Sequence, residues 1–129
     1  MLSHLGLNVP DLGAAADYYG QVLPLVGYEH FSSGEAQLGY RPANDRPGPF
    51  LFLYAALDPR PYSGEGTGLQ HVAFAVRTRG EVDAVHDLVR GLAGTILAAP
   101  RVWPEYSDRY YATFWHDPFG FKLETVCVR

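Results

Sequence analysis

Two hydrophobic periodicities follow one another in the first half of the chain. Residues 3–9 place apolar side chains at every second position, which predicts a short strand. Between Asp11, which we expect to cap a helix, and Pro24, which should end it, apolar residues recur at helical spacing. Further strands are expected at residues 28–31, 36–41 and 50–54. The first half therefore has the pattern βαβββ.

The same order of elements returns after a linker over residues 59–68 that is rich in glycine and proline. The sequence predicts a strand at 70–76, an amphipathic helix at 81–92 and strands at 95–98, 110–115 and 121–128. The segment that begins at His4 matches the one that begins at His71, with apolar residues at the same alternate positions. We therefore expect an α+β fold of two βαβββ modules, residues 1–58 and 69–129, in a single domain over residues 1–129.

Composition and charge narrow the function classes. The chain has 129 residues and a formal net charge of -4, and no run of Lys or Arg suggests a nucleic-acid partner. The first residues lack the pattern of a signal peptide, and no apolar stretch is long enough to span a bilayer. Cys127 is the single cysteine, so an internal disulfide is impossible. We expect a cytoplasmic protein that does not bind membranes and that acts on a small molecule.

Three residues form a candidate metal site. His4 and His71 occupy matching positions in the two modules, and small residues share their strand faces. Glu124 interrupts the apolar pattern of the last strand, and a buried carboxylate is costly unless it is paired or bound to a metal. Two imidazoles and one carboxylate suit Fe(II) or Mn(II), with Zn and Ni as further candidates. Alternatively, the histidines are ordinary strand residues and Glu124 pairs with Lys122 or Arg129.

Other polar and aromatic residues are candidates for substrate contacts. Arg109 and Tyr111 are the candidate catalytic residues, since they could orient an anionic or phenolic substrate. The candidate substrate-binding residues are Asn8, Tyr106, Tyr110 and Phe114. The alternative is a loop that packs its aromatic residues over the sheet edge. His116 and Asp117 resemble a catalytic pair, but Asp-Pro-Phe-Gly is typical of a turn, so we expect Asp117 to cap backbone amides.

Four segments carry a family resemblance that spans nearly the whole chain. They read HLGLNVPDL from His4, DYYGQVL from Asp17, LQHVAFAV from Leu69 and YATFWHDPFGFKLE from Tyr111. The chain resembles the vicinal oxygen chelate superfamily, which includes glyoxalase I, bleomycin-resistance proteins, extradiol dioxygenases and fosfomycin-resistance enzymes. The resemblance implies a cupped mixed sheet, commonly in a homodimer. It also implies a divalent metal ion at His4, His71 and Glu124, in many members with His4 from one chain and the other two ligands from its partner.

One departure from the family pattern bears on the reaction. Glyoxalase I has a fourth ligand, a Glu or Gln, on the last strand of the first module, where this chain has Phe52 or Leu53. Because that carboxylate also transfers protons in glyoxalase I, its absence argues against that reaction and favours dioxygenase-like or lyase-like chemistry.

The alternative is a metal-free protein that binds a drug or metabolite, as bleomycin-resistance proteins do. The acidic balance would suit a cationic ligand, and Trp103, Tyr106 and Trp115 could stack on flat rings. A pathway accessory protein with a vestigial site is a third hypothesis.

Overall fold

The computed structural model describes all residues from 1 to 129 and divides the chain into two compact units. The N-terminal unit is Met1–Arg60 and the C-terminal unit is Pro61–Arg129. The division falls inside the glycine- and proline-rich segment that the sequence marks as a linker. No helix in either unit combines the length and the apolar character needed to cross a membrane.

The N-terminal unit is a four-stranded mixed sheet with one α-helix. Its elements in chain order are β1 (His4–Val9), α1 (Leu12–Val22), a 3₁₀ turn η1 (Leu23–Val26), β2 (Tyr28–Ser33), β3 (Gln37–Pro42) and β4 (Phe50–Ala55). The strand order is β1-β4-β3-β2, with β1 parallel to β4 and the other pairs antiparallel. As predicted, Asp11 caps α1, because its side chain accepts a hydrogen bond from the amide of Ala14.

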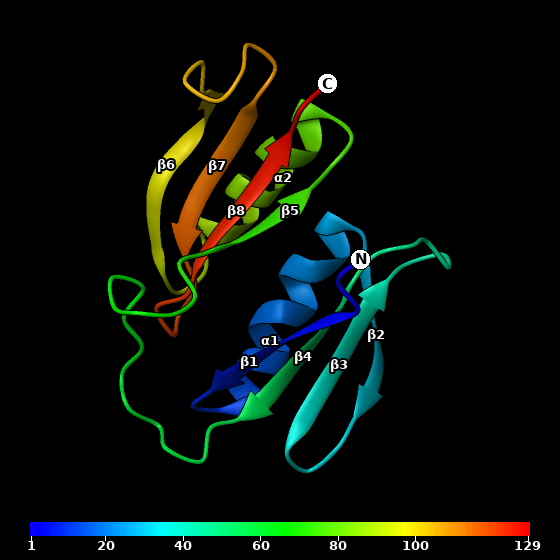
Figure 1. Cartoon of the computed structure of the whole chain (residues 1–129), viewed down its shortest axis with the longest axis vertical. Helices are drawn as coiled ribbons and strands as arrows, with labels where there is room; N and C mark the ends of the chain where they lie inside the picture. The colour runs from blue at the N-terminus through cyan, green and yellow to red at the C-terminus, as the bar shows by residue number, and fades with distance from the viewer. The chain divides into compact units, whose positions relative to one another are not determined.

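The C-terminal unit repeats this topology. Its elements are β5 (Val72–Ala75), α2 (Arg79–Val89), β6 (Thr95–Val102), β7 (Tyr111–His116) and β8 (Lys122–Cys127). The strand order is β5-β8-β7-β6, again with the first strand parallel to the last (Figure 1). The predicted α+β fold of two βαβββ modules is therefore confirmed.

Each sheet has one face toward its own helix and one face without a helix (Figure 1). In the C-terminal unit α2 buries Val82, Val85 and Val89, and side chains of β7 and β8 complete this core. Alternation along each strand then sends every second side chain to the opposite face. Glu124 lies on the face away from α2, between the core residues Leu123 and Thr125.

Two differences from the predicted element bounds have a clear physical reason. Helix α2 covers Arg79–Val89 rather than residues 81–92, and it begins two residues early because Thr78 and Glu81 form a capping box. Strand β6 continues through Pro100 to Val102, where the sequence predicts a loop after residue 98. Because β6 is the edge of its sheet and carries two register shifts, it tolerates a residue without an amide hydrogen.

Candidate functional site

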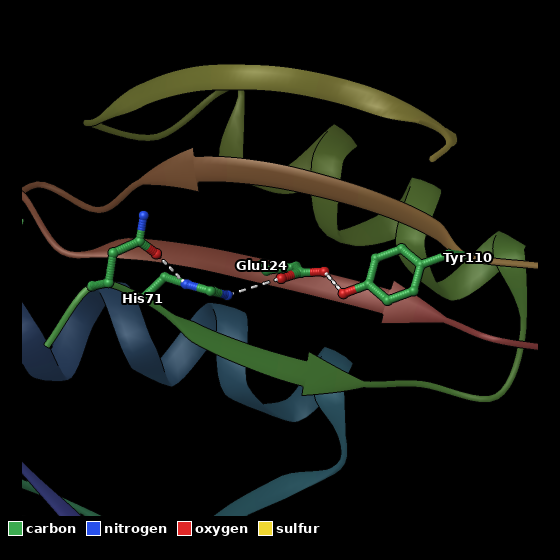
Figure 2. Close-up of polar contacts among 4 residues, drawn as sticks. His71, Tyr110 and Glu124 are labelled. Atoms are coloured by element: carbon green, nitrogen blue, oxygen red, sulfur yellow. Dashed lines mark hydrogen bonds and ion pairs between the residues drawn. The ribbon is translucent and has the colours of Figure 1, made fainter. Parts of the chain in front are cut away.

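His71 and Glu124 meet at the centre of the C-terminal sheet. His71 directly precedes β5, and the parallel register of β5 with β8 places Ala73 opposite Glu124. The Nε2 atom of His71 lies 3.2 Å from Oε2 of Glu124. Glu124 is only 1% exposed, whereas the side chain of His71 is 37% exposed. The pair (Figure 2) therefore joins a buried carboxylate to a partly exposed imidazole.

Tyr110 holds the other oxygen of the carboxylate. Its hydroxyl donates a hydrogen bond to Oε1 of Glu124 from the loop that precedes β7. Burial, together with this hydrogen bond and the charge of Glu124, raises the pKa of Tyr110 above its ordinary value. The phenol therefore remains a proton donor at neutral pH and fixes one oxygen of Glu124, while the other oxygen faces His71 (Figure 2).

Gln70 orients the imidazole from the opposite side. Its side-chain oxygen Oε1 lies at hydrogen-bond distance from Nδ1 of His71. When Nδ1 donates its proton to this oxygen, the Nε2 atom of His71 presents a lone pair to the carboxylate of Glu124. Two acceptors in such proximity repel one another unless a cation stands between them, either a proton on Nε2 or a metal ion.

The equivalent place in the N-terminal unit has no carboxylate. Strand β1 places Gly6 opposite Phe52 of β4, as β5 places Ala73 opposite Glu124, so Phe52 is the residue that corresponds to Glu124. The rings of His4 and Phe52 meet edge to face with centroids 5.6 Å apart. Leu53 is fully buried on the opposite face of β4, which settles the choice that the sequence left open between Phe52 and Leu53.

The three metal-ligand candidates are divided between the two units. His71 and Glu124 lie together in the C-terminal unit, and His4 lies in the N-terminal unit, exposed and with Nδ1 3.1 Å from the hydroxyl of Ser3. No group of three or more His, Cys, Asp or Glu side chains in the structure is arranged to hold a metal ion. Glu124 pairs with neither Lys122 nor Arg129, the alternatives that the sequence allowed.

Neither of the two catalytic candidates bonds to Glu124. Tyr111 lies on the helix side of its sheet, where its hydroxyl donates to Asp83 of α2 in a 2.6 Å hydrogen bond. This hydrogen bond raises the pKa of Tyr111 to about 12, so the phenol is a structural donor to the helix. Arg109 is exposed in the loop before β7, where its amide bonds the Ser107 hydroxyl.

The candidate substrate-binding residues fall into two groups. Phe114 is the direct cross-strand neighbour of Glu124, and Tyr106 contacts Tyr110 with ring centroids 5.0 Å apart. Asn8 is exposed on β1, two residues beyond Gly6 on the face that carries His4. Gln70 was missed by the sequence analysis, although its position directly before a candidate ligand is the signal that could have identified it.

Asp117 and Trp115, two further candidates from the sequence, both have structural roles. Asp117 caps its turn, as predicted, because its Oδ1 atom accepts hydrogen bonds from the amides of Phe119 and Phe121 at 2.9 Å. Trp115, which the sequence offered as a stacking residue, is 1% exposed and faces the α2 side of β7. It is a core residue and cannot stack on a ligand.

Comparison with known proteins identifies the family. The model of the Glyoxalase/Bleomycin resistance protein/Dioxygenase superfamily matches residues 1–125. The chain belongs to this superfamily. Its relatives include the uncharacterized protein YqjT of Bacillus subtilis (strain 168), which is 27% identical over 128 residues and is matched over 97% of both chains.

Solved structures of this superfamily share the fold. A glyoxalase/bleomycin resistance protein from Albidiferax ferrireducens superposes with a TM-score of 0.81 at 20% identity, over 98% of both chains. The fosfomycin resistance protein FosX from Listeria monocytogenes superposes with a TM-score of 0.69 at 19% identity, over 98% of this chain and 92% of that one. At such identities the likeness establishes the fold, and the chemistry has to be argued from the site.

Proposed function

We propose that this superfamily member is a metal-dependent enzyme that acts on a small oxygen-bearing substrate chelated to a divalent ion. The observation that carries the proposal is the pair of His71 and Glu124, whose Nε2 and Oε2 atoms face one another at 3.2 Å. Glu124 is buried at the centre of a sheet, where a carboxylate is costly without a cation. The imidazole beside it is oriented so that its lone pair can meet the same cation.

The spacing of the two donor atoms suits a metal ion. Ligand bonds of about 2.0–2.2 Å that meet at about 90–110° hold two donor atoms roughly 2.8–3.6 Å apart. The measured 3.2 Å between Nε2 of His71 and Oε2 of Glu124 falls inside this range. Gln70 and Tyr110 supply the outer hydrogen bonds that fix ligand orientation in metal sites generally.

His4 is the third ligand in this proposal. It occupies the same place in the N-terminal unit as His71 does in the C-terminal unit, and its Nδ1 has the hydroxyl of Ser3 within hydrogen-bond distance. Its recruitment, from the same chain or from the partner in a homodimer, completes a set of two imidazoles and one carboxylate. Fe, Mn, Zn and Ni all accept such ligands.

The chain's own residues define the rest of the chemistry. A bound divalent ion would act as a Lewis acid on two substrate oxygens. Glu124 and His71 would hold the ion at the open face of the sheet, and Tyr110 would keep the carboxylate in place. Phe52 takes the place of Glu124 in the N-terminal unit and cannot accept a proton. The reaction we propose is therefore dioxygenase-like or lyase-like rather than that of glyoxalase I.

Metal analysis of the full chain, purified without chelator, tests the proposal. We expect close to one divalent ion per site in the wild-type protein and less than a tenth of that in His71→Ala. His30→Ala is the matched control, because His30 lies on β2 and bonds Ser33. Equal metal content in wild type, His71→Ala and His30→Ala, or none in wild type after reconstitution with Fe, Mn, Zn and Ni in turn, would overturn it.

A metal-free binding protein is the second candidate function. The observation in its favour is a cavity of about 170 Å³ beside the pair, which Trp103 and Tyr106 line. In that case a proton on His71, rather than a metal ion, would separate its Nε2 from Glu124. Nitrogen NMR of the His71 ring distinguishes the two, since a protonated Nε2 resonance that added metal leaves unchanged favours the binding protein.

A further inference from the structure

The cavity beside the His71–Glu124 pair has aromatic walls. It measures about 170 Å³ and is lined by Leu97, Ala98, Trp103, Tyr106, Phe114 and Lys122. The rings of Trp103 and Phe114 meet edge to face with centroids 5.0 Å apart. A cavity of roughly 150 Å³ holds one benzene molecule, so this one has room for a single ring with a small substituent.

Two walls of the cavity, the rings of Trp103 and Phe114, are held in place without a ligand. The indole Nε1 of Trp103 donates a 3.1 Å hydrogen bond to the carbonyl of Ala112, which prevents rotation of the ring. Phe114 packs with Ala112 and Val126 in a buried cluster on this face of the sheet. A preformed aromatic slot favours a planar ligand, because ring stacking needs flat surfaces and little ordering cost remains at binding.

The one charged side chain that lines the cavity is a cation. Lys122 is the single lysine of the chain, and its Nζ lies 5.1 Å from the centroid of the Phe114 ring. None of the four ion pairs in the structure includes Lys122, and no carboxylate lines the cavity. Arg101 adds a guanidinium over the ring of Trp103, 3.4 Å from its centroid. The cationic ligand suggested by the net charge of the chain therefore does not suit this cavity.

The cavity shares its walls with the candidate metal site. Phe114 stands directly opposite Glu124 in the sheet, and its ring centroid is 6.4 Å from that of His71. Tyr106 contacts Tyr110, whose hydroxyl holds Glu124. A molecule in the cavity would therefore lie beside the two proposed ligands.

We propose that this cavity binds a single planar ring that carries an anionic group, with the ring against Trp103 and Phe114 and the anion at Lys122. The inference names the substrate class of the proposed enzyme and rests on that function for the reaction. The binding step itself needs no metal ion, so it can be tested separately.

The experiment is a proton–nitrogen NMR titration of the chelator-treated full chain with benzoate as the probe. Trp103 and Trp115 supply one indole signal each, and Trp103→Phe assigns them. We expect benzoate to shift the Trp103 signal. The Trp115 signal should not change, because Trp115 lies in the core on the other face of the sheet. Benzamide tests the charge and cyclohexanecarboxylate tests the planar ring; each should bind roughly fivefold or more weakly than benzoate.

Two variants locate the anion. In Lys122→Gln the preference for benzoate over benzamide should disappear, and in Arg129→Gln, which changes an exposed terminal cation, it should persist. Equal binding of the three probes, equal shifts of both indoles, or an unchanged preference in Lys122→Gln would overturn the inference. If the protein binds benzoate but takes up no metal, the inference is supported and the proposed metal-dependent function is refuted.

Discussion

The two places where a first strand pairs with a last strand have the same backbone and different chemistry. In the N-terminal unit β1 and β4 bring His4 beside Phe52, and in the C-terminal unit β5 and β8 bring His71 beside Glu124. The residue before each histidine also makes the same contact, since Ser3 and Gln70 lie at hydrogen-bond distance from Nδ1 of the histidine that follows. Whether this place is an aromatic contact or a candidate cation site therefore depends on one side chain of the last strand.

In the N-terminal unit, Phe52 packs in a cluster of aromatic rings. Phe52 contacts Phe31 and Tyr54 as well as His4, with ring centroids 5.6–6.3 Å apart. Gly39 makes room for these rings, since a Cβ atom there would lie 2.9 Å from the ring of Phe31 and 3.2 Å from that of Phe52. The N-terminal unit thus uses the position for ring packing, whereas the C-terminal unit uses it for polar contacts.

Exchange of the deciding side chain should have the largest effect. In Glu124→Phe the C-terminal unit receives the residue of the N-terminal unit, and we expect metal content to fall below a tenth of the wild-type value. The larger ring at a 1% exposed position should also lower the free energy of unfolding by about 1–3 kcal/mol. Mass-spectrometric metal analysis and urea unfolding measure the two effects.

The matched change in the N-terminal unit is Phe52→Leu. It removes ring contacts, which should cost about 1 kcal/mol of unfolding free energy, but it removes no ligand. Metal content should therefore stay above half of the wild-type value. If Glu124→Phe keeps its metal, or if Phe52→Leu loses it to the same extent, the comparison of the two places fails.

The residues that precede the two histidines offer a subtler comparison. Gln70→Leu leaves Nδ1 of His71 without its acceptor, and we expect metal affinity to fall about 10- to 100-fold. Ser3→Ala removes the corresponding partner of His4, but His4 faces the ring of Phe52 rather than a carboxylate, so a smaller loss of about two- to threefold is expected. Competitive titration with a chelating dye gives both affinities. A larger loss in Ser3→Ala than in Gln70→Leu would reverse the ranking of the two units.

The helix caps should give the smallest difference. Asp11 caps α1 alone, whereas Thr78 caps α2 within a reciprocal capping box with Glu81. Asp11→Ala and Thr78→Ala should each lower the free energy of unfolding by about 1 kcal/mol, with Thr78→Ala the more damaging because it also releases Glu81. Thr67→Ala, in an exposed part of the linker, should change it by less than about 0.5 kcal/mol.

The contribution of Glu81 should depend on pH. The backbone amide of Thr78 is the main cause that holds the pKa of Glu81 below its usual value. Because the pKa is lower in the folded chain, the stabilisation is present above the ordinary carboxyl pKa and is lost as pH falls through the lowered value. Urea unfolding should therefore find wild type more stable than Glu81→Gln at neutral pH and equal to it in acid. A difference that grows in acid would contradict this assignment.

Local sequence patterns were enough for most of the fold. Alternation around Leu5 and Leu7, the cap at Asp11 and the turn at Asp117 depend on residues that are neighbours in the chain, and all three predictions are confirmed. The start of α2 at Arg79 also has a local cause, the capping box, whereas the extension of β6 depends on a partner outside the local window. Pro100 stays in a strand because β6 pairs on one side only, a property of the sheet rather than of the segment.

The site itself was less predictable, because strand register decides which face a side chain occupies. Tyr110 and Tyr111 are adjacent and chemically identical, yet one donates to Glu124 and the other to Asp83 on the helix side. A shift of one residue would exchange them, and the sequence does not fix where β7 begins. The two tryptophans also differ in their surroundings, since Trp103 lines a cavity and Trp115 is in the core.

The sequence by itself determined the duplicated βαβββ pattern and the matching positions of His4 and His71, because hydrophobic periodicity and repetition are local properties of the chain. Only the tertiary structure decided that Phe52 is the counterpart of Glu124, that Tyr110 and Gln70 hold the pair, and that Lys122 faces an aromatic cavity. These facts depend on how strands pair across long sequence separations, where a single residue of register moves a side chain from one face of the sheet to the other.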